Sequence, residues 1–278
     1  MKDSLEPVAP VSTPAPWQGG KRILGSLIAE RIAEVPHQIY AEPFVGMGGV
    51  FFRRAFRPPA EAINDRNGEV VNLFRVLQVH YTAFIDHMKF QLTSRREFER
   101  LVGLDPGKLT ELQRAARFLY LQRTSFAGKA SGQNFGTTPG GPARFDLTKL
   151  APLLEDIYER LTPVTIENLD WRDFCERYDS PETLFYLDPP YWAGENDYGK
   201  GLFDRAQFSG IAEFMRSCDA KMIVSLNDVP EIRETFAGLR FEELTLNYTM
   251  ATSITGEGKQ AKEVLITNFE RPSLPLFG

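Results

Sequence analysis

Apolar residues along this chain occur in two patterns, which alternate from one segment to the next. Short apolar runs bounded by polar residues, glycine or proline are typical of buried strands, whereas spacing at i, i+3 and i+4 is typical of helices. The two kinds of segment alternate, which predicts an α/β fold with a doubly wound, mostly parallel sheet of seven strands. The last two runs have no strong helical stretch between them, so we expect them to pair antiparallel. The predicted strands are Ile39–Val45, Ala60–Asn64, Val164–Glu167, Leu184–Leu187, Met222–Leu226, Phe241–Asn247 and Glu263–Asn268.

Helical periodicity separates most of these strands and is densest between the second and the third. We therefore interpret residues 68–161 as an insert of helices and a hairpin within an α/β domain made of residues 16–67 and 162–278. Residues 1–15 are rich in proline and poor in large apolar side chains, which predicts a disordered tail. The predicted helices are Gly19–Ala33, Val50–Phe56, a long helix beginning over Glu69–Leu77, Glu97–Val102, Thr110–Leu121, Leu150–Leu161, Arg172–Tyr178, Arg205–Ser217 and Pro230–Phe236.

Positive charge is concentrated in the insert. The whole chain has a formal net charge of −5, yet residues 89–149 hold eleven Lys or Arg and five Asp or Glu. Clustered cations favour a polyanionic partner, so this segment predicts a surface for a nucleic-acid phosphate backbone. A solvated helical face would have the same composition, and that alternative remains open here.

Several function classes are excluded by what the sequence lacks. Its two cysteines and three histidines occur in no metal-ligand spacing, so we expect neither a disulfide scaffold nor a metal site. No apolar run approaches the ~20 residues that span a bilayer. The first residues do not form a signal-peptide pattern. The sequence therefore predicts a cytoplasmic protein with no membrane partner.

A glycine turn follows the first predicted strand. Gly46 and Gly48 would let the backbone approach a ligand, and a helix starting after them would offer free N–H groups. Asp65 lies 17 residues beyond Gly48, just past the second strand, close to the position where α/β nucleotide folds bind ribose hydroxyls. Together these residues predict a nucleoside site, although a tight turn without a ligand would need the same glycines.

The second chemical motif is Asp188-Pro189-Pro190-Tyr191, which directly follows a predicted strand. Two prolines fix the backbone and remove two N–H donors, so the loop offers acceptors, namely the Asp188 carboxylate and the Pro189 carbonyl. Two acceptors suit an exocyclic amino group, because they would localise its lone pair toward an electrophile. Tyr191 could stack on a planar base. We therefore predict Asp188, Pro189 and Tyr191 as the catalytic group; a stiff turn with a buried tyrosine is the alternative.

These motifs, in this order, resemble the DNA adenine-N6 methyltransferases of the Dam type, and the resemblance extends over about residues 16–269. It implies a Rossmann-like AdoMet-binding catalytic domain and a target-recognition insert. It also implies S-adenosyl-L-methionine (AdoMet) as methyl donor, S-adenosyl-L-homocysteine as product, and no metal. Double-stranded DNA would be the substrate, with the adenine flipped out and methylated in line. The matching segments are Pro16-Trp17-Gln18-Gly19-Gly20-Lys21, Glu42-Pro43-Phe44-Val45-Gly46, Asn64-Asp65-Arg66-Asn67, Phe118-Leu119-Tyr120-Leu121-Gln122-Arg123, Asn168-Leu169-Asp170-Trp171, Asp188-Pro189-Pro190-Tyr191 and Glu263-Val264-Leu265-Ile266-Thr267-Asn268.

The resemblance also assigns roles to single residues and suggests a bacterial or phage origin. The target adenine would be held by Asp188, Pro189 and Tyr191. We expect a monomer, with a cognate restriction endonuclease as a possible partner. AdoMet would be bound by Trp17, Lys21, Phe44, Gly46, Gly48, Asp65, Asp170, Trp171 and Asp188, and the DNA phosphates by Arg95, Arg96, Arg114, Arg117, Arg123 and Lys129.

Sequence specificity is not predicted. Members of the family that recognise GATC carry an arginine where this chain has Ser131, and arginine is the usual bidentate reader of guanine. Three alternatives to adenine methylation also stay open at this point. They are a cytosine-N4 methyltransferase, which would use the same amino acceptors, a protein glutamine-N methyltransferase and an inactive DNA-binding relative.

Overall fold

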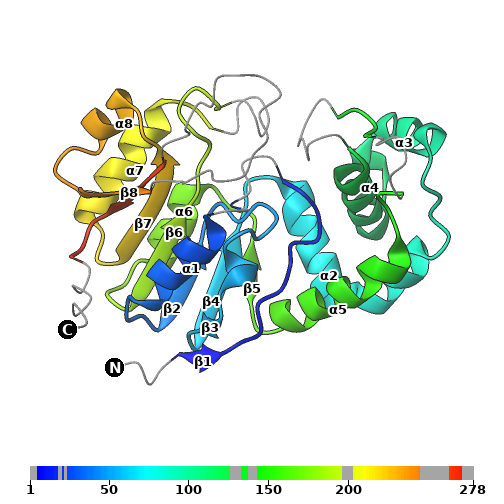
Figure 1. Cartoon of the computed structure of the whole chain (residues 1–278), viewed down its shortest axis with the longest axis horizontal. Coiled ribbons are helices and arrows are strands. Elements are labelled where there is room, and N and C mark those ends of the chain that lie inside the picture. Colours follow the sequence, from blue (N-terminus) through cyan, green and yellow to red (C-terminus); the bar gives the residue numbers. More distant parts are fainter. Residues whose placement is uncertain are drawn as a thin grey trace.

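The computed structural model describes residues 5–17, 21, 24–125, 133–136, 143–195, 203–244 and 263–270. Within these residues, seven strands form one sheet in the order β5-β4-β2-β6-β7-β9-β8 (Figure 1). Neighbours from β5 to β7 are parallel, whereas β9 is antiparallel to both β7 and β8. The predicted sheet is confirmed, including its antiparallel last pair. The strands are β2 (Ile39–Glu42), β4 (Ala60–Asn64), β5 (Thr165–Glu167), β6 (Thr183–Leu187), β7 (Lys221–Asn227), β8 (Arg240–Leu244) and β9 (Glu263–Thr267).

Side chains of the central strands alternate between two apolar cores. In β6, Leu184 and Tyr186 enter one cluster of buried residues, while Phe185 and Leu187 enter the other. Because successive side chains of a strand point to opposite faces, a strand buried on both faces must be apolar throughout. All five residues of β6 are buried, which places its C-terminal end deep in the middle of the sheet.

Helices cover both faces of the sheet, as the doubly wound prediction requires. One core contains residues of the first helix, such as Ile28 and Ile32, and the other contains residues that follow β5 and β6, such as Phe174 and Ile211. The helices are α1 (Gly25–Ala33), α2 (Gly68–Met88), α3 (Arg95–Val102), α4 (Glu111–Thr124), α5 (Leu147–Leu161), α6 (Trp171–Tyr178), α7 (Ala206–Ser217) and α8 (Pro230–Thr235), with short 3-10 turns η1 (Phe51–Arg53) and η2 (Pro106–Lys108).

The group α2–α5 extends to one side of the sheet (Figure 1). Side chains cap its helices: Asn67 accepts from Glu69 N at 3.0 Å at the start of α2, and Thr110 and Gln113 form a capping box on α4. Phe74 and Leu119 of this group belong to the same apolar cluster as Ile63 of β4. The insert therefore shares a core with the sheet, and its division from the catalytic domain at residues 68 and 161 stays a prediction.

The predicted disordered tail is wrong for residues 5–15; residues 1–4 lie outside the described ones. Strand β1 (Glu6–Pro7) pairs with β3 (Phe56–Arg57). The backbone then continues along η1, where Val11 N donates to Phe52 O at 2.8 Å, and Ala15 is buried. Backbone hydrogen bonds, which the polar and proline-rich composition does not reveal, hold this segment. We call residues 8–17 the N-terminal strap.

The predicted helix Val50–Phe56 is also wrong. The chain makes only the 3-10 turn η1 and is extended at Arg54, with ψ of 129°. This conformation buries the Arg54 guanidinium 3.6 Å from the Tyr40 ring centroid, where it pairs with Glu61. Arg160 of α5 pairs with the same carboxylate at 2.6 Å. A buried cation must be paired, so this cluster overrides the helical preference of the segment.

Candidate active site

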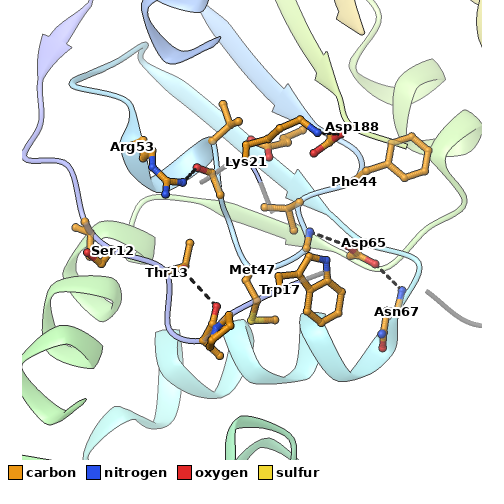
Figure 2. Close-up of a pocket in the computed structure, with 18 of the residues that line it drawn as sticks. Ser12, Thr13, Trp17, Lys21, Phe44, Met47, Arg53, Asp65, Asn67 and Asp188 are labelled. Atoms are coloured by element: carbon orange, nitrogen blue, oxygen red, sulfur yellow. Dashed lines mark hydrogen bonds and ion pairs between the residues drawn. The ribbon is translucent and has the colours of Figure 1, made fainter. Parts of the chain in front are cut away.

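A cavity of about 670 Å³ opens at the carboxyl ends of β2, β4 and β6 (Figure 2). Ligands of open α/β sheets bind at this edge, because the strand-to-helix turns converge there. Its walls are the N-terminal strap, the glycine turn after β2, and residues at the ends of β4 and β6. The glycine turn and Asp188 therefore open into one cavity, as their positions after predicted strands indicated. Of the predicted catalytic residues Asp188, Pro189 and Tyr191, only Asp188 lines it.

The glycine turn has a backbone that other residues adopt only with strain. Gly46 has φ of +49° and Gly48 has φ of +74°, both in the left-handed region. A Cβ atom on Gly46 would lie 2.7 Å from Nε1 of Trp17, and one on Gly48 would overlap the ring of Phe52. The turn thus needs glycine for conformation and for the close approach of Trp17, which itself lines the cavity.

The side chain of Asp65 is held beside the glycine turn by two backbone hydrogen bonds. Its Oδ2 accepts from Gly46 N at 2.9 Å and its Oδ1 from Asn67 N at 2.8 Å. Burial raises the pKa of Asp65 to about 6, although the two backbone N–H groups oppose the rise. Each carboxylate oxygen keeps acceptor capacity beyond these bonds. The side chain can therefore receive hydroxyl donors from a ligand in the cavity.

Lys21 connects the two predicted catalytic side chains. Its Nζ donates to Asp188 Oδ1 at 2.6 Å and to the Tyr191 hydroxyl at 2.6 Å. The same ammonium lies 4.6 Å from the Tyr191 ring centroid. Burial raises the pKa of Asp188, and the charge of Lys21 lowers it. Lys21 is itself buried, so this is a desolvated ion pair rather than a surface contact.

Ser225 contacts the predicted catalytic residue Asp188, and the sequence reasoning missed it. Its hydroxyl donates to Asp188 Oδ1 at 3.1 Å and is 2.9 Å from the Tyr186 hydroxyl. Both hydrogen bonds that described residues give to Asp188 thus end on Oδ1, which leaves Oδ2 to accept from a ligand. A serine inside the apolar strand Lys221–Asn227 was the available signal, because a buried hydroxyl needs a partner.

The loop after β6 is held from β7. Asn227 accepts from Trp192 N at 2.9 Å and donates to Trp192 O at 3.2 Å. Gly194 N donates to Tyr191 O at 2.8 Å, which closes a turn. These contacts, together with the two prolines, fix the loop on which Asp188 and Tyr191 lie.

Comparison with protein families shows to which family the chain belongs. The family model for D12 class N6 adenine-specific DNA methyltransferases matches residues 17–252. The chain belongs to this family. It is also similar to two curated proteins, the type II methyltransferase M1.LlaDCHI of Lactococcus lactis subsp. cremoris, at 26% identity over 91% of this chain and 94% of that protein, and the type II methyltransferase M.CviBI of Paramecium bursaria Chlorella virus NC1A, at 23% identity over 84% of this chain and 89% of that protein.

Membership of the D12 class excludes two of the three alternatives left by the sequence. The chain is a DNA methyltransferase specific for N6 of adenine, not a cytosine-N4 or protein glutamine methyltransferase, and membership of a methyltransferase family implies the use of AdoMet. Among the described residues, no group of three or more His, Cys, Asp or Glu is arranged to hold a metal ion. No helix in the described part of the chain is long and apolar enough to cross a membrane.

Not every residue predicted to bind AdoMet reaches the D12 methyltransferase cavity. Trp17, Lys21, Phe44, Gly46, Asp65 and Asp188 line it, whereas Gly48 does not and packs against Phe52. Asp170 instead caps α6 by accepting from Arg172 N at 3.0 Å. Trp171 is buried against Phe214, with ring centroids 6.3 Å apart. The cofactor roles of Asp170 and Trp171 stay predictions.

The basic residues predicted to hold DNA are in different environments. Arg95 and Arg96 are exposed at the start of α3. Arg114 pairs with Glu69, and Arg117 donates to Leu101 O at 2.7 Å. Lys129 lies outside the described residues.

Arg123, the remaining residue of this group, lines the cavity. It donates to Pro14 O of the N-terminal strap at 2.7 Å, while its neighbour Gln122 donates to Pro16 O at 3.0 Å. The strap is therefore tied to α4 of the insert, and the phosphate role of Arg123 stays a prediction.

Proposed function

We propose that this D12 methyltransferase holds a flipped-out adenine of double-stranded DNA at Asp188, Pro189 and Tyr191 and methylates it by direct in-line transfer. The observation that carries the proposal is the environment of the Asp188 carboxylate. It lies at the wall of the cavity, is only 19% exposed, and accepts two hydrogen bonds on Oδ1. Oδ2 is then the acceptor that can receive one hydrogen of the adenine amino group.

The residues of the cavity fit AdoMet. Its volume of about 670 Å³ is within the ~300–1,000 Å³ of small-molecule sites. Asp65 offers carboxylate oxygens for ribose hydroxyls, and Trp17 and Phe44 give planar apolar walls. We assign cofactor binding to these three residues with Lys21, Gly46 and Gly48. Bound there, AdoMet supplies an electrophilic methyl group on a sulfonium.

The side chains act by aligning and polarising the target amino group. Asp188 Oδ2 and the Pro189 carbonyl accept its two hydrogens, which localises the nitrogen lone pair. The charge of Lys21 opposes the rise that burial causes in the pKa of Asp188. The Tyr191 ring stacks on the adenine, while its hydroxyl stays tethered to Lys21. Alignment of this kind converts binding energy into rate without a covalent enzyme intermediate.

The insert supplies the DNA-binding surface in this proposal. Arg95 and Arg96, exposed on α3, contact phosphates, and the segment after α4 reads the DNA sequence. We further propose that the enzyme acts as a cytoplasmic monomer and that a restriction endonuclease of the same specificity accompanies it. The two similar type II methyltransferases support the last point.

Replacement of Asp188 by asparagine tests the proposal. Asparagine keeps the shape but removes the charge that Lys21 and Ser225 stabilise, so we expect methyl transfer to fall by about 10²-fold or more, the range of a misaligned site. AdoMet binding by calorimetry should persist, since Asp65 and the glycine turn are untouched. Asp219→Asn, at an exposed aspartate, is the matched control. Methylation by Asp188→Asn at the wild-type rate would refute the assignment.

A further inference from the structure

Glu263 is a charged residue beside Asp188 that belongs neither to the glycine turn nor to the Asp188-Pro189-Pro190-Tyr191 loop. It is the first residue of β9 and is buried, although every other residue of that strand is apolar or threonine. Because β9 runs antiparallel to β7, its first residue lies opposite Asn227 at the carboxyl end of β7. The antiparallel strand thereby brings a carboxylate to the edge where β6 delivers Asp188.

Glu263 completes the coordination of Lys21. An ammonium has three N–H donors, and Lys21 Nζ has three oxygen neighbours: Asp188 Oδ1 at 2.6 Å, the Tyr191 hydroxyl at 2.6 Å and Glu263 Oε1 at 3.3 Å. Oε1 is buried and accepts no hydrogen bond among the described residues. It acts on Lys21 through charge, and Glu263 itself does not line the cavity.

We propose that Glu263 is a positioning residue of the methyl transfer: it fixes the Lys21 ammonium in the place where that ammonium joins Asp188 to Tyr191. The inference rests on the proposed roles of Asp188 and Tyr191. Without Glu263, Lys21 keeps its contact with Asp188 but loses the charge that fixes its orientation. Asp188 and the Tyr191 ring are then no longer held in a fixed position relative to each other by Lys21.

The two carboxylates also set the local charge. Asp188 and Glu263 together exceed the single charge of Lys21, so the corner is negative by one unit when all three groups are ionised. A methyl group transferred to N6 leaves that nitrogen positive until it releases a proton. A fixed negative corner is complementary to this developing charge. Glu263→Gln would keep the shape of the side chain but remove the excess negative charge.

The test uses the full chain with Glu263→Gln. We expect the single-turnover rate of methyl transfer to fall about 10- to 100-fold, with the Kd for AdoMet and the KM for DNA within about twofold of wild type. Glu243→Gln, on the neighbouring strand and 64% exposed, is the matched control and should leave the rate unchanged. A rate within twofold of wild type for Glu263→Gln overturns the inference, as does a loss confined to AdoMet or DNA binding.

A double-mutant cycle with Lys21→Gln separates positioning from mere packing. If Glu263 acts through Lys21, its replacement has little further effect once Lys21 is gone. Additive losses in the double variant would overturn the inference. The proposed function is judged separately: Asp188→Asn with full activity would refute that function, whereas an inactive Asp188→Asn beside a fully active Glu263→Gln would refute only the role of Glu263.

Discussion

The close approach of Gly46 to Trp17 allows a quantitative test of the cofactor site. Gly46→Ala adds a Cβ at φ of +49°, 2.7 Å from the indole Nε1. The left-handed backbone alone costs about 1–2 kcal/mol for a non-glycine residue. The contact is closer than real Cβ atoms tolerate, so Trp17 must also move out of the wall that it gives to the cavity. We expect AdoMet affinity to fall at least about tenfold, equivalent to ~1.4 kcal/mol.

Gly238→Ala provides the control, because Gly238 has φ of +86° but no atom within 4 Å of the added Cβ. This variant therefore has the free-energy cost of a left-handed backbone but no steric contact like that between Gly46→Ala and Trp17. Both variants should lower the melting temperature by ~2–4 °C per kcal/mol, whereas only Gly46→Ala should weaken AdoMet binding in calorimetry without DNA. If Gly46→Ala binds AdoMet as tightly as Gly238→Ala does, the reasoning about Trp17 is refuted.

Two further predictions concern charge. Lys21→Met removes the cation that lowers the pKa of Asp188 against burial, so the acid limb of the single-turnover pH–rate profile, measured at saturating AdoMet, should move to higher pH; an unmoved limb would contradict the ion pair. Arg123→Met cuts the bond to Pro14 O and should weaken AdoMet binding several-fold in the absence of DNA. Arg96→Ala should instead leave AdoMet binding intact and reduce the slope of log K for DNA against log salt by about 1. If Arg123→Met changed only the salt dependence of DNA binding and Arg96→Ala changed only AdoMet binding, the positions assigned to both arginines would be contradicted.

The sheet was predictable because its strands are buried on both faces. Runs such as Leu184–Leu187 are apolar throughout, and their order along the chain left little choice of topology. The positions of Asp65 and Asp188 at one edge then followed from the parallel arrangement of the strands that precede them. The local sequence was sufficient to predict the buried strands and the residues that follow their ends.

What the sequence did not predict depends on contacts between distant residues. The N-terminal strap is held by backbone groups of residues near Phe52, about which its own composition carries no signal. Arg54 leaves the predicted helix to pair with the buried carboxylate of Glu61, which Arg160 also contacts. Ser225 was visible only as a polar exception inside an apolar strand, and it acquires a role because β6 places Asp188 beside it.

The position of β9 has a consequence for how the sheet is assembled. This strand follows β8 in the chain, yet it lies between β7 and β8, and β8 pairs with no other described strand. During synthesis, β8 therefore leaves the ribosome before its pairing partner exists, and β7 presents an open edge until β9 is inserted. Closure of this half of the sheet is a late event in the folding of the nascent chain, and a chain that stops short of β9 would expose two unpaired strand edges to other proteins.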